Sequence, residues 1–469
     1  MNRFDKIFFI LLLTISLTIS LPIRINAIVT VSAFTVFAIL IVSLGNFSRE
    51  FIKSPVFNLL AIQFILLLIG LLYTSDIEKG MSDVERSSFI LAYLIISQYP
   101  LKKMTVSYLI LAFAAGCFSI TFYGLYYALF VLTGGQQKQV FELGHTYFAD
   151  IILIHPLYLS IYFIFIFFFL LETARTKKLM LTNLSLAGIG VALISITGII
   201  FFLRSQMSLI TFAMLLVMYT IIILKRRAWL VTFIFFFLLE TARTKKLMLT
   251  NLSLAGIGVA LISITGIIFF LRSQMSLITF AMLLVMYTII ILKRRAWLVT
   301  FILFTIALLV FLLDQNRVTT FFDTYGKNVS TALDQRFSVW QGTIEGIKTA
   351  PFFGAGTGGE QQLINEGYAK TGYQEGIDNS YNAHNQYLQF MARNGILELG
   401  CFLTLLIYSF RQSLKMPNYT FLMFNMSVTL IMFTESFLDV QRGIVFFYFF
   451  LCAFIYLPYE STTQPLKDV

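Results

Sequence analysis

The chain has 469 residues, of which 58% are hydrophobic and only 12% are charged, and its mean hydropathy is +0.84. This composition excludes a soluble globular domain. The net charge of +11 comes from basic residues near the ends of apolar runs, which indicates cytoplasmic loops and not nucleic-acid binding. The three cysteines lie within apolar runs and predict no disulfide framework.

Apolar runs of about twenty residues recur along the chain, so we predict an all-α, polytopic helical membrane bundle. The first run is similar to a signal peptide, but no small-residue cleavage site follows it and further spans do. The predicted spans lie at 7–22, 26–45, 55–74, 88–100, 106–132, 157–171, 180–203, 206–224, 248–271, 274–292, 296–313, 389–410, 419–434 and 443–458.

A block of the chain is duplicated, because residues 165–232 recur without change at 233–300. Natural repeats diverge between copies, so this identity indicates a recent tandem duplication, a sequence-assembly error or an engineered feature. The junction at 228–239 is apolar, but as a helix it reaches only about 18 Å, short of a ~30 Å hydrocarbon core. We therefore expect that the junction does not cross the membrane and that the extra copy adds two spans.

The positive-inside rule orients these spans. Arg3 and Lys6 place the N-terminus in the cytoplasm, and the C-terminus returns there. A polar stretch at 314–388 then lies outside. The predicted organisation is N-terminal spans (1–164), the two copies of the block (165–232 and 233–300), a span leading to the loop (301–313), the large outer loop (314–388), and C-terminal spans with a cytoplasmic tail (389–469).

The outer loop is too long for a plain connector, and we expect function there. One face of a predicted helix in it is apolar and is expected to pack on the membrane bundle; that face carries Leu333, Phe337, Trp340, Ile344 and Ile347. Arg336 lies beside this face, either as a surface ion pair or as an anion ligand. The glycine-rich segment at 354–359 follows no strand and is expected to form turns and not a phosphate loop.

A second helix is expected after the helix-starting residues at 378–382, with His384 in its first turn. The positive end of a helix dipole disfavours imidazolium, and a neutral imidazole suits a general base. The alternative is an interfacial histidine that makes a local hydrogen bond. The spacing of His384 with His145 and His155 is not typical of a metal site.

Charged residues also fall at the predicted outer ends of other spans. Arg204 and its copy Arg272 interrupt apolar runs, where they either snorkel to the interface or bind a lipid phosphate. Glu435, Asp439 and Arg442 fall in a short outer turn and are expected to pair with one another or with the long loop.

Together these features resemble the O-antigen ligase and polymerase superfamily over most of the chain. The family's Arg-x-x-x-Trp helix is matched by Arg336 and Trp340, and its P-x-x-G-x-G turn by residues 351–356. Its later His-Asn pair is matched by His384 and Asn385.

Two further positions bear on the resemblance. Gly395 follows the histidine at the family's spacing, whereas Glu398 stands where a second glycine is common. The family's outer arginine at the start of a span is matched by Arg204 or Arg272. Without one copy of the block the chain would have 401 residues and about twelve spans, as expected for the family.

The resemblance implies a glycosyltransferase that uses an undecaprenyl-diphosphate-linked glycan and needs no metal or other cofactor. It would act at the periplasmic face of the bacterial inner membrane, as a ligase that joins O-antigen to lipid A-core. Its partners would be the lipid-linked glycan, the lipid A-core or growing glycan acceptor, and membrane lipid.

The resemblance also implies roles for single residues. His384 would be the general base, and Asn385 would orient it. Arg336, with Arg204 or Arg272, would hold the diphosphate, on which charge builds in the transition state. The residues expected to support this site are Trp340, Glu435 and Arg442.

Other interpretations remain open at this point. A polymerase of the same superfamily would use the same donor, and transfer to protein hydroxyls is a third enzymatic option. A polysaccharide flippase would be expected to carry charges at mid-membrane and paired half-repeats. A nonfunctional product of the duplication is the remaining alternative.

Overall fold

The computed structural model describes residues 3–44, 53–94, 106–127, 130, 151–176, 183–202, 208, 211–212, 214–216, 218–219, 335–416 and 419–457. Every regular element in these ranges is a helix, which confirms the predicted all-α fold. The chain divides into two compact units, Met1–Ser208 with Ser338–Val469, and Leu209–Phe337. The second copy of the block and residues 301–334 lie outside the described residues, as do His145, Arg204, Arg272 and parts of the first copy.

The first unit contains the elements that carry the candidate site. In chain order these are α1 (Arg3–Thr18), α2 (Ile23–Leu44), α3 (Pro55–Gly70), α4 (Ile77–Ser87), α5 (Phe89–Leu94), α6 (Val106–Tyr126), α8 (Pro156–Thr176), α9 (Asn183–Phe202), α16 (Glu360–Thr371), α17 (Gln374–Asp378), α18 (Gln386–Ser413), α19 (Thr420–Met432), the 3₁₀ turn η6 (Phe437–Asp439) and α20 (Gln441–Tyr456).

Four of the described helices are long and apolar enough to cross a membrane, and they are α2, α6, α8 and α18. Shorter apolar helices include α3, α19 and α20. These helices coincide with predicted spans and support a membrane protein. The segment at 75–87, between two predicted spans, contains the polar helix α4.

Aromatic side chains form the centre of the bundle. Phe113 of α6 contacts Tyr162 of α8 and Phe446 of α20, with ring centroids 5.1 Å and 5.5 Å apart. Phe424 of α19 joins the same cluster through Phe165, at 5.2 Å. Edge-on and offset ring contacts add to the stabilisation that area burial provides, so this cluster holds α6, α8, α19 and α20 together.

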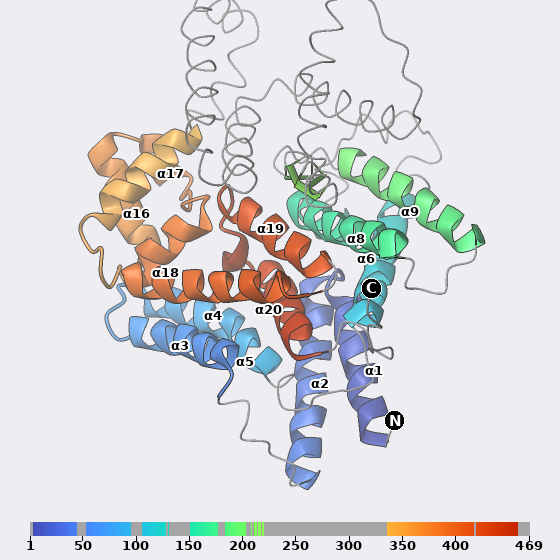
Figure 1. The fold of residues 1–469 in the computed structure, drawn as a ribbon. Helices are drawn as coiled ribbons and strands as arrows, with labels where there is room; N and C mark the ends of the chain where they lie inside the picture. The colour runs from blue at the N-terminus through green and yellow to red at the C-terminus, as the bar shows by residue number, and fades with distance from the viewer. Residues whose placement is uncertain are drawn as a thin grey trace, which may run out of the picture. The chain divides into compact units, whose positions relative to one another are not determined.

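The long helix α18 connects this bundle to the polar segments. Figure 1 shows α18 between α16 and α17 on one side and α3 and α4 on the other, and both α3 and α16 pack against it. Residues 335–385, hereafter the polar layer, therefore lead into a helix that is itself part of the bundle.

The helix at 335–347 packs differently from the prediction. Phe337 and Ile344 are exposed, at 52% and 43%, whereas Val339, Thr343 and Ile347 are buried. This helix lies against α16, because Gly342 and Gly367 allow the two backbones to meet: a Cβ added at Gly367 would be 1.9 Å from the Gly342 carbonyl oxygen. The expected apolar face is therefore buried only in part: Ile347 is buried and Trp340 packs against the cluster beside α16, whereas Phe337 and Ile344 are exposed.

Candidate functional site at the start of α18

A side chain caps the N-terminus of α18. Asn385 is the N-cap residue, and its Oδ1 accepts hydrogen bonds from the backbone N–H groups of Tyr387 (3.0 Å) and Leu388 (3.1 Å). His384 therefore precedes the helix, and the prediction that it lies in the first turn was wrong. The physical reason is that the Asn385 side chain, and not a residue at 378–382, satisfies the first free N–H groups of the helix.

The backbone of His384 has an unusual conformation. Its φ is +43°, in the left-handed region that non-glycine residues seldom adopt. The His384 N–H donates to Oδ1 of Asn382 (3.0 Å), and the N–H of Ala383 donates to Oε1 of the buried Gln389 (3.2 Å). Such a conformation persists where its surroundings hold it, and here two side chains fix the backbone on which the imidazole stands.

The imidazole of His384 lies against a carboxylate. Its Nδ1 is 3.3 Å from Oε2 of Glu435, and the two side chains are 31% and 22% exposed. The ring of Tyr381 stands edge-on to the imidazole, with centroids 6.1 Å apart. When Nδ1 carries the proton and donates it to Glu435, Nε2 keeps its lone pair and can accept a proton from another molecule.

Hydrogen bonds between α18 and the end of α19 bring Glu435 to His384. The Nδ2 of Asn385 donates to the carbonyl of Phe433 (3.0 Å), and the hydroxyl of Tyr387 donates to the carbonyl of Thr429 (3.1 Å). Asn385 thus caps one helix and binds the C-terminus of another, so it positions both members of the His384–Glu435 pair.

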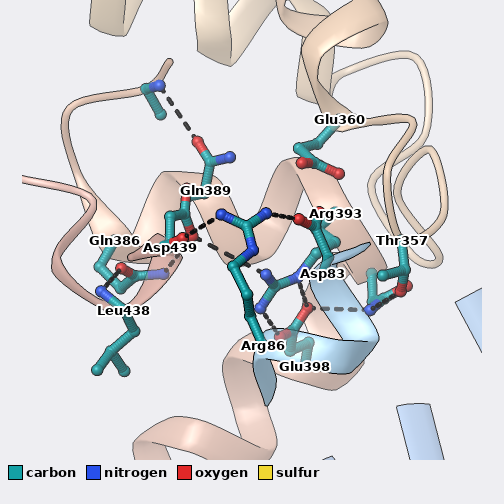
Figure 2. A network of polar contacts seen from close by, with 12 residues as sticks. Asp83, Arg86, Thr357, Glu360, Gln386, Gln389, Arg393, Glu398, Leu438 and Asp439 are labelled. Atoms are coloured by element: carbon teal, nitrogen blue, oxygen red, sulfur yellow. Dashed lines mark hydrogen bonds and ion pairs between the residues drawn. The ribbon is translucent and has the colours of Figure 1, made fainter. Parts of the chain in front are cut away.

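A polar network, most of it buried, surrounds Arg393 of α18 (Figure 2). The guanidinium of Arg393 donates through Nε to Oε2 of Glu398 (3.0 Å) and through a second N–H to the other carboxylate oxygen. A third nitrogen of Arg393 is 3.9 Å from Oδ1 of Asp439. Glu398 is fully buried, which is possible because Arg393 neutralises it.

Gln386, in the first turn of α18, ties the network to η6. Its Nε2 donates to Oδ1 of Asp439 (3.3 Å), and its Oε1 accepts from the backbone N–H of Leu438 (2.6 Å). Because the turn at 433–440 carries Glu435, the network fixes the carboxylate that faces His384.

Asp439 lies in this network but outside the membrane-spanning helices, and its pKa is shifted. Burial raises the pKa of Asp439 to about 6; Arg393 lowers it, and the carboxylate of Glu360 raises it further. Glu360 is itself paired with Lys79 at 2.6 Å. Arg86 donates to the backbone carbonyl of Asp439 (3.0 Å), which adds a contact from α4 to the same turn.

The turn at 351–356 packs against a break in α18. Asn394 and Gly395 leave helical geometry, which frees the carbonyls of Ala392 and Arg393. These accept hydrogen bonds from the N–H groups of Ala355 (2.9 Å) and Gly356 (2.8 Å), and Ile396 donates back to the carbonyl of Pro351 (3.1 Å). The P-x-x-G-x-G turn is therefore a backbone partner for the helix break, in agreement with the expectation that its glycines form turns.

The other expected site residues lie as follows. Trp340 packs against the hydrophobic cluster under α16. Arg442 is buried and donates to the carbonyls of Leu21 (3.1 Å) and Leu153 (2.6 Å), so it joins α20 to two other segments and does not reach the pair. Arg336 is partly buried. It belongs to the second compact unit, whereas His384 belongs to the first.

Sequence reasoning missed Gln386, Arg393 and Glu398 as parts of the site. The available signal was the pair of opposite charges in the otherwise apolar helix, five residues apart. That spacing does not match adjacent positions on a helix, and only the break at 394–395 brings the two side chains together.

Among the residues that the structure describes, no group of three or more His, Cys, Asp or Glu side chains is arranged to hold a metal ion. His155 lies at the start of α8, where its Nδ1 accepts from the N–H of Leu157 (3.3 Å).

Comparison with known proteins gives one match, to part of the chain. No curated protein matches the chain. A family model described as O-antigen ligase matches residues 258–404. The matched range includes Arg272, Arg336, His384 and Asn385, and it begins in the second copy of the block. This match over residues 258–404 supports the resemblance of the chain to the O-antigen ligase superfamily.

Proposed function

We propose that this protein transfers a glycan from an undecaprenyl-diphosphate carrier to a sugar hydroxyl of lipid A-core, at the periplasmic face of the bacterial inner membrane, with His384 as the general base. The observation that carries the proposal is the contact of 3.3 Å between Nδ1 of His384 and Glu435 at the partly exposed start of α18. A carboxylate at Nδ1 orients the ring and leaves Nε2 to act as the base.

The transfer requires one proton movement and one exchange of bonds at the anomeric carbon. Nε2 of His384 accepts the proton of the acceptor hydroxyl as its oxygen forms a bond to that carbon. The bond from the carbon to the diphosphate oxygen breaks, and its electron pair leaves with undecaprenyl diphosphate. The proton then passes from the imidazolium to solvent or to the leaving diphosphate, which returns His384 to its neutral form.

Glu435 and Asn385 act through His384 in this scheme. The Glu435 carboxylate stabilises the imidazolium that forms in the transition state. Asn385 caps α18 and binds the carbonyl of Phe433, so it holds the imidazole and the carboxylate at their separation.

Arginine side chains bind the diphosphate in this proposal. Guanidinium groups match phosphate oxygens in geometry and stay charged. Arg336 lies in the family-matched range, and Arg272 does too, whereas its copy Arg204 does not. We therefore assign the diphosphate to Arg336 together with Arg272, and Arg204 is the alternative ligand.

The experiment compares surface glycans of cells that carry the intact gene, a deletion, or a His384→Ala gene. A ligase predicts that deletion removes all polymer from lipid A-core. A polymerase of the same superfamily would instead leave core with a single repeat unit. His384→Ala is expected to give the deletion pattern, since loss of a general base costs about 10²–10⁴-fold in rate; a normal pattern at normal protein level would refute the assignment.

A further inference from the structure

A hollow lined by polar and apolar groups lies between α4 and α16, and its lining residues do not include the His384–Glu435 pair. It has a volume of about 860 Å³ and is lined by residues 75–79 and by one face of α16. This volume lies within the range of roughly 300–1,000 Å³ that is usual for ligand sites.

Amide side chains dominate the α16 side of the hollow. Gln361, Gln362 and Asn365 line it, and Ser75 faces them from the segment before α4. Each amide offers both donors and an acceptor, and a hydroxyl does the same. Sugar hydroxyls also donate and accept, so these side chains suit a carbohydrate, and Ile77 and Ala369 provide apolar surface beside them.

The charges of the hollow are negative. Its only basic lining residue, Lys79, is neutralised by the buried carboxylate of Glu360 at 2.6 Å. Asp76 caps α4 by accepting from the N–H of Lys79 (2.9 Å), and Glu78 and Glu366 add two further carboxylates. An anionic ligand would meet these like charges, whereas an uncharged or amine-bearing one would not.

A chain of contacts leads from the hollow to His384. Gln361 lines the hollow and its Nε2 donates to the backbone carbonyl of Tyr381 (3.1 Å). The ring of Tyr381 stands against the imidazole, with centroids 6.1 Å apart. A glycan in the hollow would therefore contact Gln361, which is hydrogen-bonded to the segment that carries the proposed general base.

We propose that the hollow between α4 and α16 binds uncharged or amine-bearing sugar units of a glycan that takes part in the transfer. This inference deepens the proposed function and rests on it for the identity of the glycan as donor or acceptor. The binding itself is a separate property that can be measured without turnover.

The test uses the purified full chain in lipid nanodiscs and saturation-transfer NMR with three trisaccharide probes. These are an N-acetylglucosamine trimer, a glucosamine trimer and a galacturonic acid trimer. The first two are expected to bind, and the third is expected to bind about tenfold more weakly because of like charges. The variant Glu78→Gln with Glu366→Gln is expected to remove this difference.

A matched pair of variants separates the hollow from general surface effects. Gln362 donates to Glu366 (3.1 Å) in the hollow, and Gln374 donates to Asp378 (2.7 Å) on α17, outside it, with the same spacing along the chain. Gln362→Ala combined with Asn365→Ala should weaken the neutral probe by about fivefold or more, whereas Gln374→Ala should leave its binding unchanged.

Three results would overturn the inference: no probe binds, all three probes bind equally, or Gln374→Ala weakens binding of the neutral probe as much as Gln362→Ala with Asn365→Ala does. Competition with undecaprenyl-diphosphate-linked glycan or with core oligosaccharide assigns the bound sugar to donor or acceptor. The His384→Ala protein should still bind the probes. If it also keeps transfer activity, the proposed function fails while the binding site stands.

Discussion

His384 combines a partly exposed ring with a backbone that neighbouring side chains hold in place. Asn382 binds its N–H and Asn385 caps the helix that follows, so the imidazole is fixed from both sides. The carboxylate of Glu435 lies within hydrogen-bonding distance of Nδ1 of His384. This arrangement leaves one direction, through Nε2, in which the ring can take up a proton.

The role of Glu435 can be tested by substitution. Glu435→Gln keeps the size and an acceptor oxygen but removes the charge that stabilises the imidazolium, so we expect kcat for glycan transfer to fall about 10–100-fold with little change in KM. Steady-state transfer by the purified chain measures both values. Glu345→Gln, at a surface carboxylate that pairs with Lys348, is the control and should change neither.

An equal loss in both variants, or a change in KM alone, would show that Glu435 does not act on the proton transfer. An unchanged kcat in Glu435→Gln would show that its contact with His384 has no part in the reaction.

Asp439 predicts a pH dependence of stability. Its pKa rises from an ordinary value of 3.8 to about 6 in the folded protein, so the folded state binds the proton more tightly than the unfolded state. Stability should therefore fall as pH increases from about 4 to about 6 and then level off. Asp439→Asn, which cannot ionise, should remove this part of the slope when Tm is measured across that range; an unchanged slope would contradict the assignment.

The helix break at 394–395 explains why the network around Arg393 could not be predicted from the sequence. Helical periodicity predicts neighbours three or four residues apart, and Arg393 and Glu398 are five apart. The partner of His384 lies 51 residues away, on a turn whose docking depends on Asn385 and Gln386. Sequence patterns therefore predicted most of the apolar helices, and the family resemblance pointed to His384 and Asn385, but the tertiary contacts around them could not be read from local spacing.

Gly395 offers a direct test of the break. Its φ is +65°, and an added Cβ would lie 2.1 Å from the carbonyl oxygen of Phe352. Gly395→Ala should lower the free energy of unfolding by at least about 1–3 kcal/mol from backbone strain alone. Gly400→Ala is the control on the same helix, because no neighbouring atom lies within 4 Å of an added Cβ, and alanine there should be neutral or slightly stabilising. Equal thermal stability of the two variants in detergent would contradict the described packing.

The Arg393–Glu398 pair gives a second test of α18. Arg393→Met leaves the buried Glu398 carboxylate without its main partner and is expected to cost about 3–5 kcal/mol. The double variant Arg393→Met with Glu398→Leu removes both charges and should recover most of that loss. Chemical unfolding of the three proteins measures the difference, and a double variant no more stable than the single one would argue against a charge pair.

At the scale of the whole molecule, the proposed function requires that His384 lies on the outer side of the membrane. The duplicated block adds two spans if the junction at 228–239 does not cross, and the polar layer then lies outside. The junction at 228–239 lies outside the described residues, so the predicted orientation rests on the charge counts of the sequence.

Cysteine labelling tests the orientation. Lys370 on α16 and Arg411 near the end of α18 are both exposed, and the prediction places them on opposite sides of the membrane. In intact cells with a permeable outer membrane, an impermeant maleimide should label Lys370→Cys and should label Arg411→Cys only after the inner membrane is opened. The reverse pattern would place the polar layer in the cytoplasm.

The most direct measurement of the central claim is transfer by the purified full chain from a synthetic undecaprenyl-diphosphate glycan to lipid A-core. We expect product formation by the wild-type protein and a loss of about 10²–10⁴-fold in rate for His384→Ala, with donor binding retained. Transfer at the wild-type rate by His384→Ala would contradict it.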